Sequence, residues 1–267
     1  MRKTVSIRPE SVSLLNMTLG NVDEAGCVRR IMAALGQGRG GWVVTSNVDI
    51  LRRYARDPGF RALAQGASLF VADGMPLIWA SKLQGSPLPE RVTGSSLITT
   101  LSAAAAARGK SVFLLGGEAG TAEAAAAVLR RRCPGLNVAG TYCPAPGFDA
   151  DARQMALLRD ALCRARPDIV YVALGCPKQE SLISAVRDCL PCAWWLGIGI
   201  SFSFLAGRVR RAPDWIQQVG LEWAHRLAQE PRRLARRYLV DGIPFALYLL
   251  SISLGVGLRK TLRDWRG

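Results

Sequence analysis

The chain has 267 residues, of which 49% are hydrophobic and 21% are charged, so it can bury a large core and is not a disordered protein. Its formal net charge of +15 requires an anionic partner, for which nucleic acid, a phosphorylated substrate and acidic lipid are the candidates. From Leu205 onward, twelve Lys and Arg residues face five Asp and Glu residues, so a surplus of seven lies in the last quarter of the chain.

The cysteines and the first residues indicate where the protein works. Seven cysteines at irregular spacing do not predict a disulfide framework, and reduced thiols are typical of the cytoplasm. The opening stretch MRKTVSIRPESVSLLN lacks the continuous apolar segment of a signal peptide. We therefore expect a cytoplasmic location.

Short apolar runs alternate with helical patterns along most of the chain. Apolar strands separated by helices predict a parallel sheet that is covered on both faces. The expected fold is α/β, a Rossmann-like, doubly wound parallel sheet. The predicted strands cover residues 41–45, 68–72, 111–115, 136–141, 168–174 and 193–197.

No strand is predicted after Gly207, so we divide the chain into a core of residues 1–207 and a basic helical appendage of residues 208–267. Residues 243–258 form an uncharged run that is shorter than the about 20 residues of a membrane span. Arginine clusters on both sides favour an interfacial or re-entrant helix on an anionic membrane surface. A helix that packs on the core is the alternative.

The stretch FVADGMP places Asp73 where a predicted strand stops. Asp is a preferred N-cap residue, so Asp73 could cap a following helix. Ligands of open parallel sheets bind outside the carboxyl ends of the strands, where an acid could instead act as a general base. Position alone favours the cap.

Other predicted strands also end in polar residues or glycines. Thr45 and Asn47 could hydrogen-bond a sugar or a base, and Asn47 could also cap a helix. Gly116 and Gly117 open a glycine-rich turn whose backbone amides could bind phosphate, although such turns are often needed only for packing. Arg91 could hold a diphosphate, with Thr93 as a helix cap.

The stretch GCPKQE follows another predicted strand. Pro177 is expected to be the first helical residue, which places Lys178, Gln179 and Glu180 in one turn facing the same crevice. Three polar residues there exceed what capping requires.

The sequence supplies few metal ligands. His225 is the single histidine. Asp149 and Asp151 form a D-x-D pattern, but acids at the start of a helix explain it adequately. We expect no metal and no cofactor, and any diphosphate would then have to be met by arginine.

Taken together, these motifs resemble the WecG/TagA/CpsF family of bacterial glycosyltransferases. The resemblance runs from about Leu14 to Tyr238. It rests on T-S-N-V-D, V-A-D-G-M-P, P-E-R-V-T-G, F-L-L-G-G, G-C-P-K-Q-E, F-L-A-G and R-A-P-x-W-I-x-x-x-G-L-E-W-x-x-R-L-x-x-E-P-R-R. The length and the apolar tail also resemble GumM-type glucosyltransferases of exopolysaccharide assembly.

The resemblance implies a metal-independent, inverting transfer of a hexose from a UDP-sugar to a polyprenyl-diphosphate-linked saccharide. The donor would be UDP-glucose or UDP-N-acetylmannosamine. The enzyme would work peripherally at the cytoplasmic face of the inner membrane, and the basic appendage would contact the membrane and help to complete the active site.

The resemblance also assigns roles. Inversion requires a base, and the family carboxylate maps onto Asp73. Thr45 and Asn47 resemble groups that bind the donor sugar or the acceptor, and Arg91 and Gln179 resemble diphosphate or sugar contacts. Ser203 stands where the family usually has an acid, which leaves Asp73 as the stronger base.

The appendage arginines Arg226, Arg233 and Arg236 would lie within roughly 80° of one another on a continuous helix. Pro231 could instead break the helix near Glu230 and turn the second segment toward the crevice. Either geometry could present guanidinium groups to a β-phosphate leaving group, and solvated surface charge is the alternative.

Two other function classes compete. A nucleic-acid-binding protein would explain the charge, but a recognisable nucleic-acid motif is lacking, so no nucleic-acid partner is expected. A nicotinamide oxidoreductase would need the full G-x-G-x-x-G fingerprint after a first strand, which is also lacking. The oligomeric state is not predicted.

Overall fold

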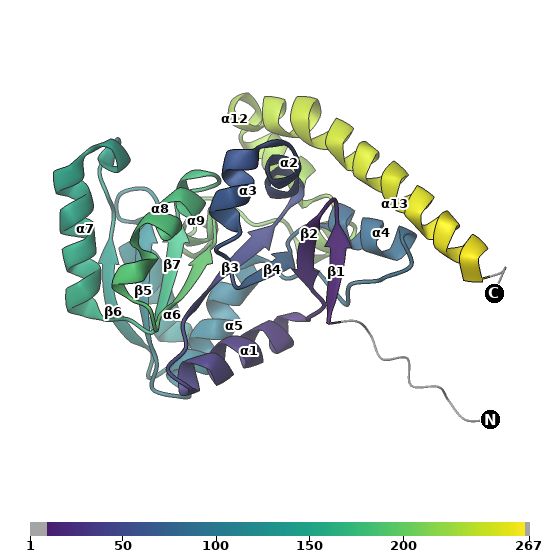
Figure 1. Cartoon of the computed structure of the whole chain (residues 1–267). Coiled ribbons are helices and arrows are strands. Elements are labelled where there is room, and N and C mark those ends of the chain that lie inside the picture. Colours follow the sequence, from purple (N-terminus) through teal and green to yellow (C-terminus); the bar gives the residue numbers. More distant parts are fainter. Residues whose placement is uncertain (1–9, 265–267) are drawn as a thin grey trace.

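A six-stranded, all-parallel sheet forms the centre of the molecule (Figure 1). The computed structural model describes residues 10–264. The strand order is β4-β3-β8-β7-β5-β6, and the predicted doubly wound α/β fold is confirmed. The strands are β3 (Gly41–Ser46), β4 (Leu69–Ala72), β5 (Ser111–Gly116), β6 (Asn137–Tyr142), β7 (Ile169–Ala173) and β8 (Trp194–Gly197).

The strands form because their apolar residues are buried on both faces of the sheet. Every residue of β5, β7 and β8 is buried. Successive side chains point to opposite faces, so Phe113 and Leu115 enter one hydrophobic core while Val112 and Leu114 enter the other. All six predicted strands are confirmed, with boundaries that differ by one residue or less at either end.

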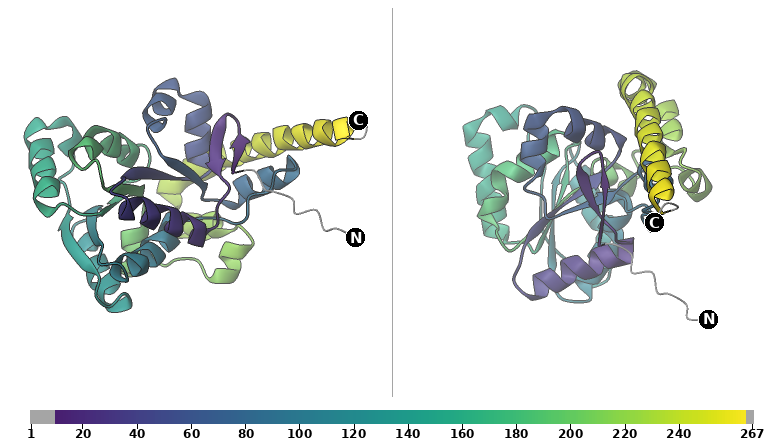
Figure 2. Two further views of the ribbon diagram at one scale, coloured as in Figure 1. Left: turned by 60° about the horizontal axis from the view of Figure 1, so that its bottom comes forward. Right: turned by 45° about the vertical axis from the view of Figure 1, so that its right-hand side comes forward.

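Helices cover both faces of the sheet, as Figure 2 shows from two directions. The helices that share a core on one face are α1 (Glu24–Gly36), α5 (Gly94–Ala106) and α6 (Thr121–Arg132). Those that share a core on the other are α2 (Val48–Arg56), α3 (Pro58–Ala64), α4 (Met75–Leu83), α7 (Ala152–Ala165) and α8 (Lys178–Val186). A short helix, α9 (Ser201–Leu205), follows β8.

An N-terminal hairpin was not predicted from the sequence. Strands β1 (Ser11–Leu14) and β2 (Met17–Gly20) pair antiparallel through a two-residue turn in which Leu15 and Asn16 have positive φ. Such turns match the twist of hairpin strands, but Leu is an unusual residue in them, so the sequence signal is weak. The hairpin lies against β4, where a side chain on Gly20 would collide with Leu69.

The appendage consists of short helices followed by one long helix. They are α10 (Asp214–Gln218), α11 (Glu222–Gln229), α12 (Pro231–Ala235), a π-helical segment (Arg236–Gly242) and α13 (Ile243–Asp264). The helix breaks at Glu230, whose backbone angles of φ −134° and ψ 58° are not helical, and restarts at Pro231. This confirms the prediction that the helix breaks near Pro231. The alternative, one continuous helix through this region, is wrong.

Helix α13 packs along α4 and then extends beyond the sheet (Figure 1). Phe245 and Leu249 are buried in the core, and a side chain on Gly257 would collide with the carbonyl oxygen of Leu83. The apolar run of residues 243–258 is thus part of a helix of 22 residues, which is longer than the run itself. Within residues 10–264, the helical stretch Pro231–Arg263 is long and apolar enough to cross a membrane, judged by length and composition. Of its most apolar 18 residues, 17% are buried.

Candidate active site

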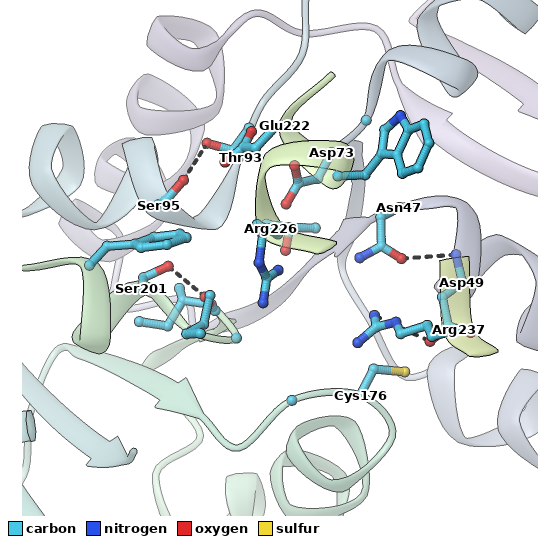
Figure 3. Close-up of a pocket in the computed structure, with 18 of the residues that line it drawn as sticks. Asn47, Asp49, Asp73, Thr93, Ser95, Cys176, Ser201, Glu222, Arg226 and Arg237 are labelled. Carbon is cyan, nitrogen blue, oxygen red and sulfur yellow. Dashed lines mark hydrogen bonds and ion pairs between the residues drawn. The ribbon is translucent and has the colours of Figure 1, made fainter. Parts of the chain in front are cut away.

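A cavity of about 850 Å³ opens at the carboxyl ends of the strands. Loops after β3, β4, β5, β7 and β8 form its floor, and α9, α11 and the π-helical segment form its walls. This is where open parallel sheets bind their ligands. Figure 3 shows side chains from the sheet loops and from the appendage pointing into the same space.

Asp73 lies at this edge but does not cap a helix. Its backbone amide donates to the Ser46 carbonyl at 2.7 Å, which continues the pairing of β4 with β3. Helix α4 begins at Met75 with Gly74 as its N-cap residue, and no side chain within the described part of the chain caps it. The capping interpretation of Asp73 is therefore wrong, and its partly buried side chain lines the cavity.

Burial raises the pKa of Asp73 to about 7. The positive charge of Arg91 opposes this rise, and the negative charge of Glu222 adds to it. A hydrogen bond from the Gly94 amide and the charge of Arg211 also lower the pKa, but they do not outweigh burial. The carboxylate can therefore hold or release a proton near neutral pH.

An ion-pair cluster joins the core to the appendage next to Asp73. Arg91 donates to the Oε2 atom of Glu222 at 2.7 Å, and the Nε atom of Arg211 lies 3.8 Å from its Oε1 atom. Arg91 also donates to Gln217 at 3.3 Å. We did not identify Arg211 and Glu222 from the sequence, although both belong to the R-A-P and G-L-E-W parts of the quoted motif.

Thr45 and Asn47 line the cavity at the end of β3. The Thr45 hydroxyl donates to the Gly197 carbonyl at 3.0 Å, which ties β3 to β8. The Asn47 side-chain oxygen accepts from the amides of Asp49 and Ile50, so the predicted N-cap of α2 is confirmed. The sheet therefore holds the Thr45 side chain in place, and the first turn of α2 holds that of Asn47.

Lys178, Gln179 and Glu180 do not face one crevice, so that prediction is wrong. Gln179 lines the cavity, where its oxygen accepts from the Gly199 amide at 3.1 Å and its nitrogen donates to Glu180 at 2.8 Å. Glu180 is 1% exposed, and burial raises its pKa. Lys178 points outward and lies 3.9 Å from Asp149. Helix α8 begins at Lys178, one residue later than expected.

Only one of the two predicted glycines after β5 lies at the cavity. Gly117 lines the cavity, whereas Gly116 is the last residue of β5 and does not. A side chain on Gly117 would collide with the Thr121 hydroxyl, and its φ of +82° is one that glycine readily adopts. Packing therefore accounts for this glycine without a ligand. Thr93 caps α5, as predicted.

The appendage brings four arginines to the cavity, and this set differs from the three that we expected. They are Arg208, Arg226, Arg233 and Arg237. Arg226 and Arg233 line it, and Arg237 takes the place that we predicted for Arg236. The break at Glu230 and the wider π-helical turns shift the register by one residue. Arg226 stacks over Phe204 with 6.0 Å between guanidinium and ring centre, and Arg237 pairs with Asp49 at 3.3 Å.

Residues that could hold a metal are sparse. Within residues 10–264, no three His, Cys, Asp or Glu side chains gather into a group that could bind an ion. Asp151 caps α7, which confirms the helix-start interpretation of that acid, and Asp149 lies toward Lys178. Ser203, at the position where an acid was expected, lines the cavity and is 8% exposed.

Comparisons with known proteins agree with this arrangement. The sequence profile described as "Glycosyl transferase WecG/TagA/CpsF family" matches residues 12–256. A Bacillus spizizenii protein named N-acetylglucosaminyldiphosphoundecaprenol N-acetyl-beta-D-mannosaminyltransferase is 34% identical over 202 residues, which cover 76% of each chain. A Bacillus subtilis protein of the same name is 29% identical over 197 residues, or 74% of this chain and 75% of its own.

The profile match covers nearly the whole chain and includes the residues of the cavity from both the sheet and the appendage. This protein therefore belongs to the WecG/TagA/CpsF family of glycosyltransferases.

Proposed function

We propose that the enzyme transfers a hexosyl group from a UDP-sugar to a polyprenyl-diphosphate-linked saccharide, with inversion and without a metal ion. The observation that carries the proposal is the Asp73 carboxylate, which is partly buried at the end of a parallel strand, has a pKa of about 7 and faces a cavity lined with arginines. The names of the two relatives support a lipid-diphosphate-linked acceptor.

In this mechanism Asp73 removes the proton of the acceptor hydroxyl as the oxygen attacks the anomeric carbon of the donor. The new glycosidic bond forms on the face opposite the UDP, and the bond from the anomeric carbon to the phosphate oxygen breaks. The electron pair of that bond stays with UDP. A base whose pKa lies near the working pH is well suited to this step.

The leaving diphosphate needs positive charge, which the appendage can supply. Arg226, Arg233 and Arg237 line one wall of the cavity and can donate to phosphate oxygens. Thr45, Asn47 and Gln179 lie on the sheet side, where their positions suit contacts with sugar hydroxyls. In this arrangement arginine takes the role that a divalent ion has in other transferases.

The outer face of α13 suits an anionic membrane surface. Leu247, Leu254, Leu258 and Leu262 are 63%, 47%, 58% and 58% exposed, and their spacing places them within about 80° of one another on the helix. The buried residues Phe245 and Leu249 lie on the opposite side, against the core. A helix packed on one side and apolar on the other fits peripheral, interfacial binding at the cytoplasmic face better than a lipid-surrounded span.

The same helix connects that surface to the cavity. Ile243 and Ala246, in the first turn of α13, line the cavity. An acceptor whose lipid tail stays in the membrane could therefore reach Asp73 along the start of α13.

The donor sugar is proposed as either glucose or N-acetylmannosamine, both as UDP derivatives. The names of the relatives favour the N-acetylmannosaminyl group, whereas the apolar tail resembles the glucosyltransferases. A screen of both donors against a lipid-linked monosaccharide, read out by mass spectrometry of the product, tests this choice. Transfer of neither sugar would contradict the proposal.

Replacing the base should abolish most of the activity. Asp73→Asn is expected to lower turnover by a factor on the order of 10² to 10⁴, because general base catalysis contributes that much. UDP binding, measured by calorimetry, should remain close to that of the wild type. Wild-type turnover in this variant would place the base elsewhere.

The same variant should be more stable than the wild type above pH 7. An aspartate in an unfolded chain has a pKa of about 3.9, whereas that of folded Asp73 is about 7. The folded state therefore holds the proton more tightly, and ionisation of Asp73 reduces the free energy of unfolding as the pH rises through this window.

Asparagine carries no charge and avoids that cost. At pH 8 the free energy of unfolding of Asp73→Asn in urea should exceed that of the wild type by on the order of 1–3 kcal/mol. The difference should shrink toward pH 4. An asparagine variant that is less stable than the wild type at pH 8 would show that the ionised carboxylate is stabilised in the fold.

Chelation should leave the activity intact. EDTA is expected to have little effect on turnover, because the arginines of the cavity can balance the diphosphate charge and neither Asp149 nor Asp151 lines the cavity. The measurement is the initial rate before and after dialysis against EDTA. A strong loss that Mg²⁺ or Mn²⁺ reverses would contradict the metal-independent mechanism.

Charges on the outer face of α13 should weaken membrane binding. The double variant Leu254→Glu, Leu258→Glu is expected to bind vesicles that contain phosphatidylglycerol at least roughly tenfold more weakly, because two exposed apolar side chains no longer enter the lipid. Leu157→Glu, at a 49% exposed position on α7, is the matched control and should bind normally. Equal vesicle binding by the double variant would remove α13 as the membrane contact.

A further inference from the structure

Glu222 is one of the other acids in the cavity, and the mechanism above gives it no role. It lies in the first turn of α11, and its side chain is 18% exposed. One carboxylate oxygen accepts from Arg91 at 2.7 Å and the other lies 3.8 Å from Arg211. Both oxygens are therefore directed at guanidinium groups.

The two arginines are also fixed from other directions. Arg91 donates to the Gln217 side chain at 3.3 Å, and Gln217 in turn donates to the Ala212 carbonyl at 2.6 Å. Arg211 donates to the Ser96 hydroxyl at 3.2 Å. The cluster thus has defined geometry and crosses from the core to the appendage over 131 residues of sequence.

All three charged groups act electrostatically on Asp73, which lines the same cavity as Arg91 and Glu222. Arg91 comes from the segment before α5, Arg211 from the segment before α10, and Glu222 from α11. The Gly94 amide completes this environment. Further along the appendage, Arg226, Glu230 and Arg233 line the same cavity. Among the charged groups that act most strongly on the Asp73 carboxylate, Glu222 is the acid that opposes the two cations.

We propose that Glu222 is a positioning residue, whose carboxylate holds Arg91 and Arg211 and offsets their charge beside Asp73. The appendage would thereby set the strength of the base as well as supply phosphate contacts. The inference rests on the proposed function of Asp73 as the base. Its electrostatic part, however, can be measured without activity.

The experiment titrates Asp73 directly in the full-length protein. The ¹³C signal of its carboxyl group, assigned by its loss in Asp73→Asn, is followed against pH. In Glu222→Gln the midpoint should fall by on the order of one pH unit, because a like charge is lost and the arginines then stabilise the ionised form. The acid limb of kcat/KM should move to lower pH by the same amount.

Two control variants test whether a shift of the Asp73 midpoint comes from the lost charge of Glu222 or only from a lost contact between the appendage and the core. Asp241→Asn also removes an acid that joins the appendage to the core, through Arg52 at 3.6 Å, but neither residue lines the cavity. It should leave the Asp73 midpoint unchanged. Glu222→Asp keeps the charge and should restore most of the wild-type midpoint.

Each outcome decides one question. An unchanged midpoint in folded Glu222→Gln would reduce Glu222 to an attachment point and overturn the inference. A shifted carboxyl midpoint with an unshifted rate profile would keep the electrostatic role but overturn Asp73 as the base. If Glu222→Gln does not fold, Arg211→Gln takes its place. Its Asp73 midpoint should rise because a cation is lost, and any other result overturns the inference.

Discussion

The sheet is parallel and covered on both faces, and this constraint determines where chemistry can occur. With α1, α5 and α6 on one face and α2, α3, α7 and α8 on the other, the faces are closed to a ligand. The backbone groups that remain open are those at the strand ends. Five strand-to-helix loops converge there, so residues far apart in sequence, such as Asn47, Asp73 and Gln179, meet in one cavity.

The appendage covers part of the cavity that lies at the ends of the sheet strands. The cavity has a polar floor from the strand loops and a wall of guanidinium groups from residues beyond 207. Four of the twelve basic residues from Leu205 onward therefore lie at the cavity. Arginines at the cavity pair with nearby acids, as Arg91 does with Glu222 and Arg237 with Asp49, which limits the mutual repulsion of their charges.

The sequence predicted the parts that depend on local pattern. All six strands of the sheet were recognised, because buried parallel strands are continuous apolar runs, and the caps Asn47 and Thr93 follow from residue type. The role of Asp73 was open from position alone, because whether an acid caps a helix depends on one turn of backbone geometry. The expectation for Lys178 and Glu180 failed because successive residues on a helix point in different directions.

Other features depend on contacts that no local pattern encodes. Arg237 rather than Arg236 reaches the cavity, because a π-helical segment changes the angle per residue, and such segments have no reliable sequence signature. The β1–β2 hairpin turns through Leu15, a residue that turn statistics do not favour. Glu222 stood in a quoted motif, but its partner Arg91 is 131 residues away and only the fold brings the two together.

Helix α13 packs closely on α4, and this packing sets the distance between the exposed leucines of α13 and the cavity. Gly257 lets the two helices touch at the Leu83 carbonyl, and α4 begins two residues after Asp73. The helix that carries the exposed leucines, α13, also begins at the cavity, which Ile243 and Ala246 line. On the proposed function, the packing of α13 on α4 would hold Asp73 at a set height above the membrane that those leucines contact, so the acceptor hydroxyl would have to be presented at that height.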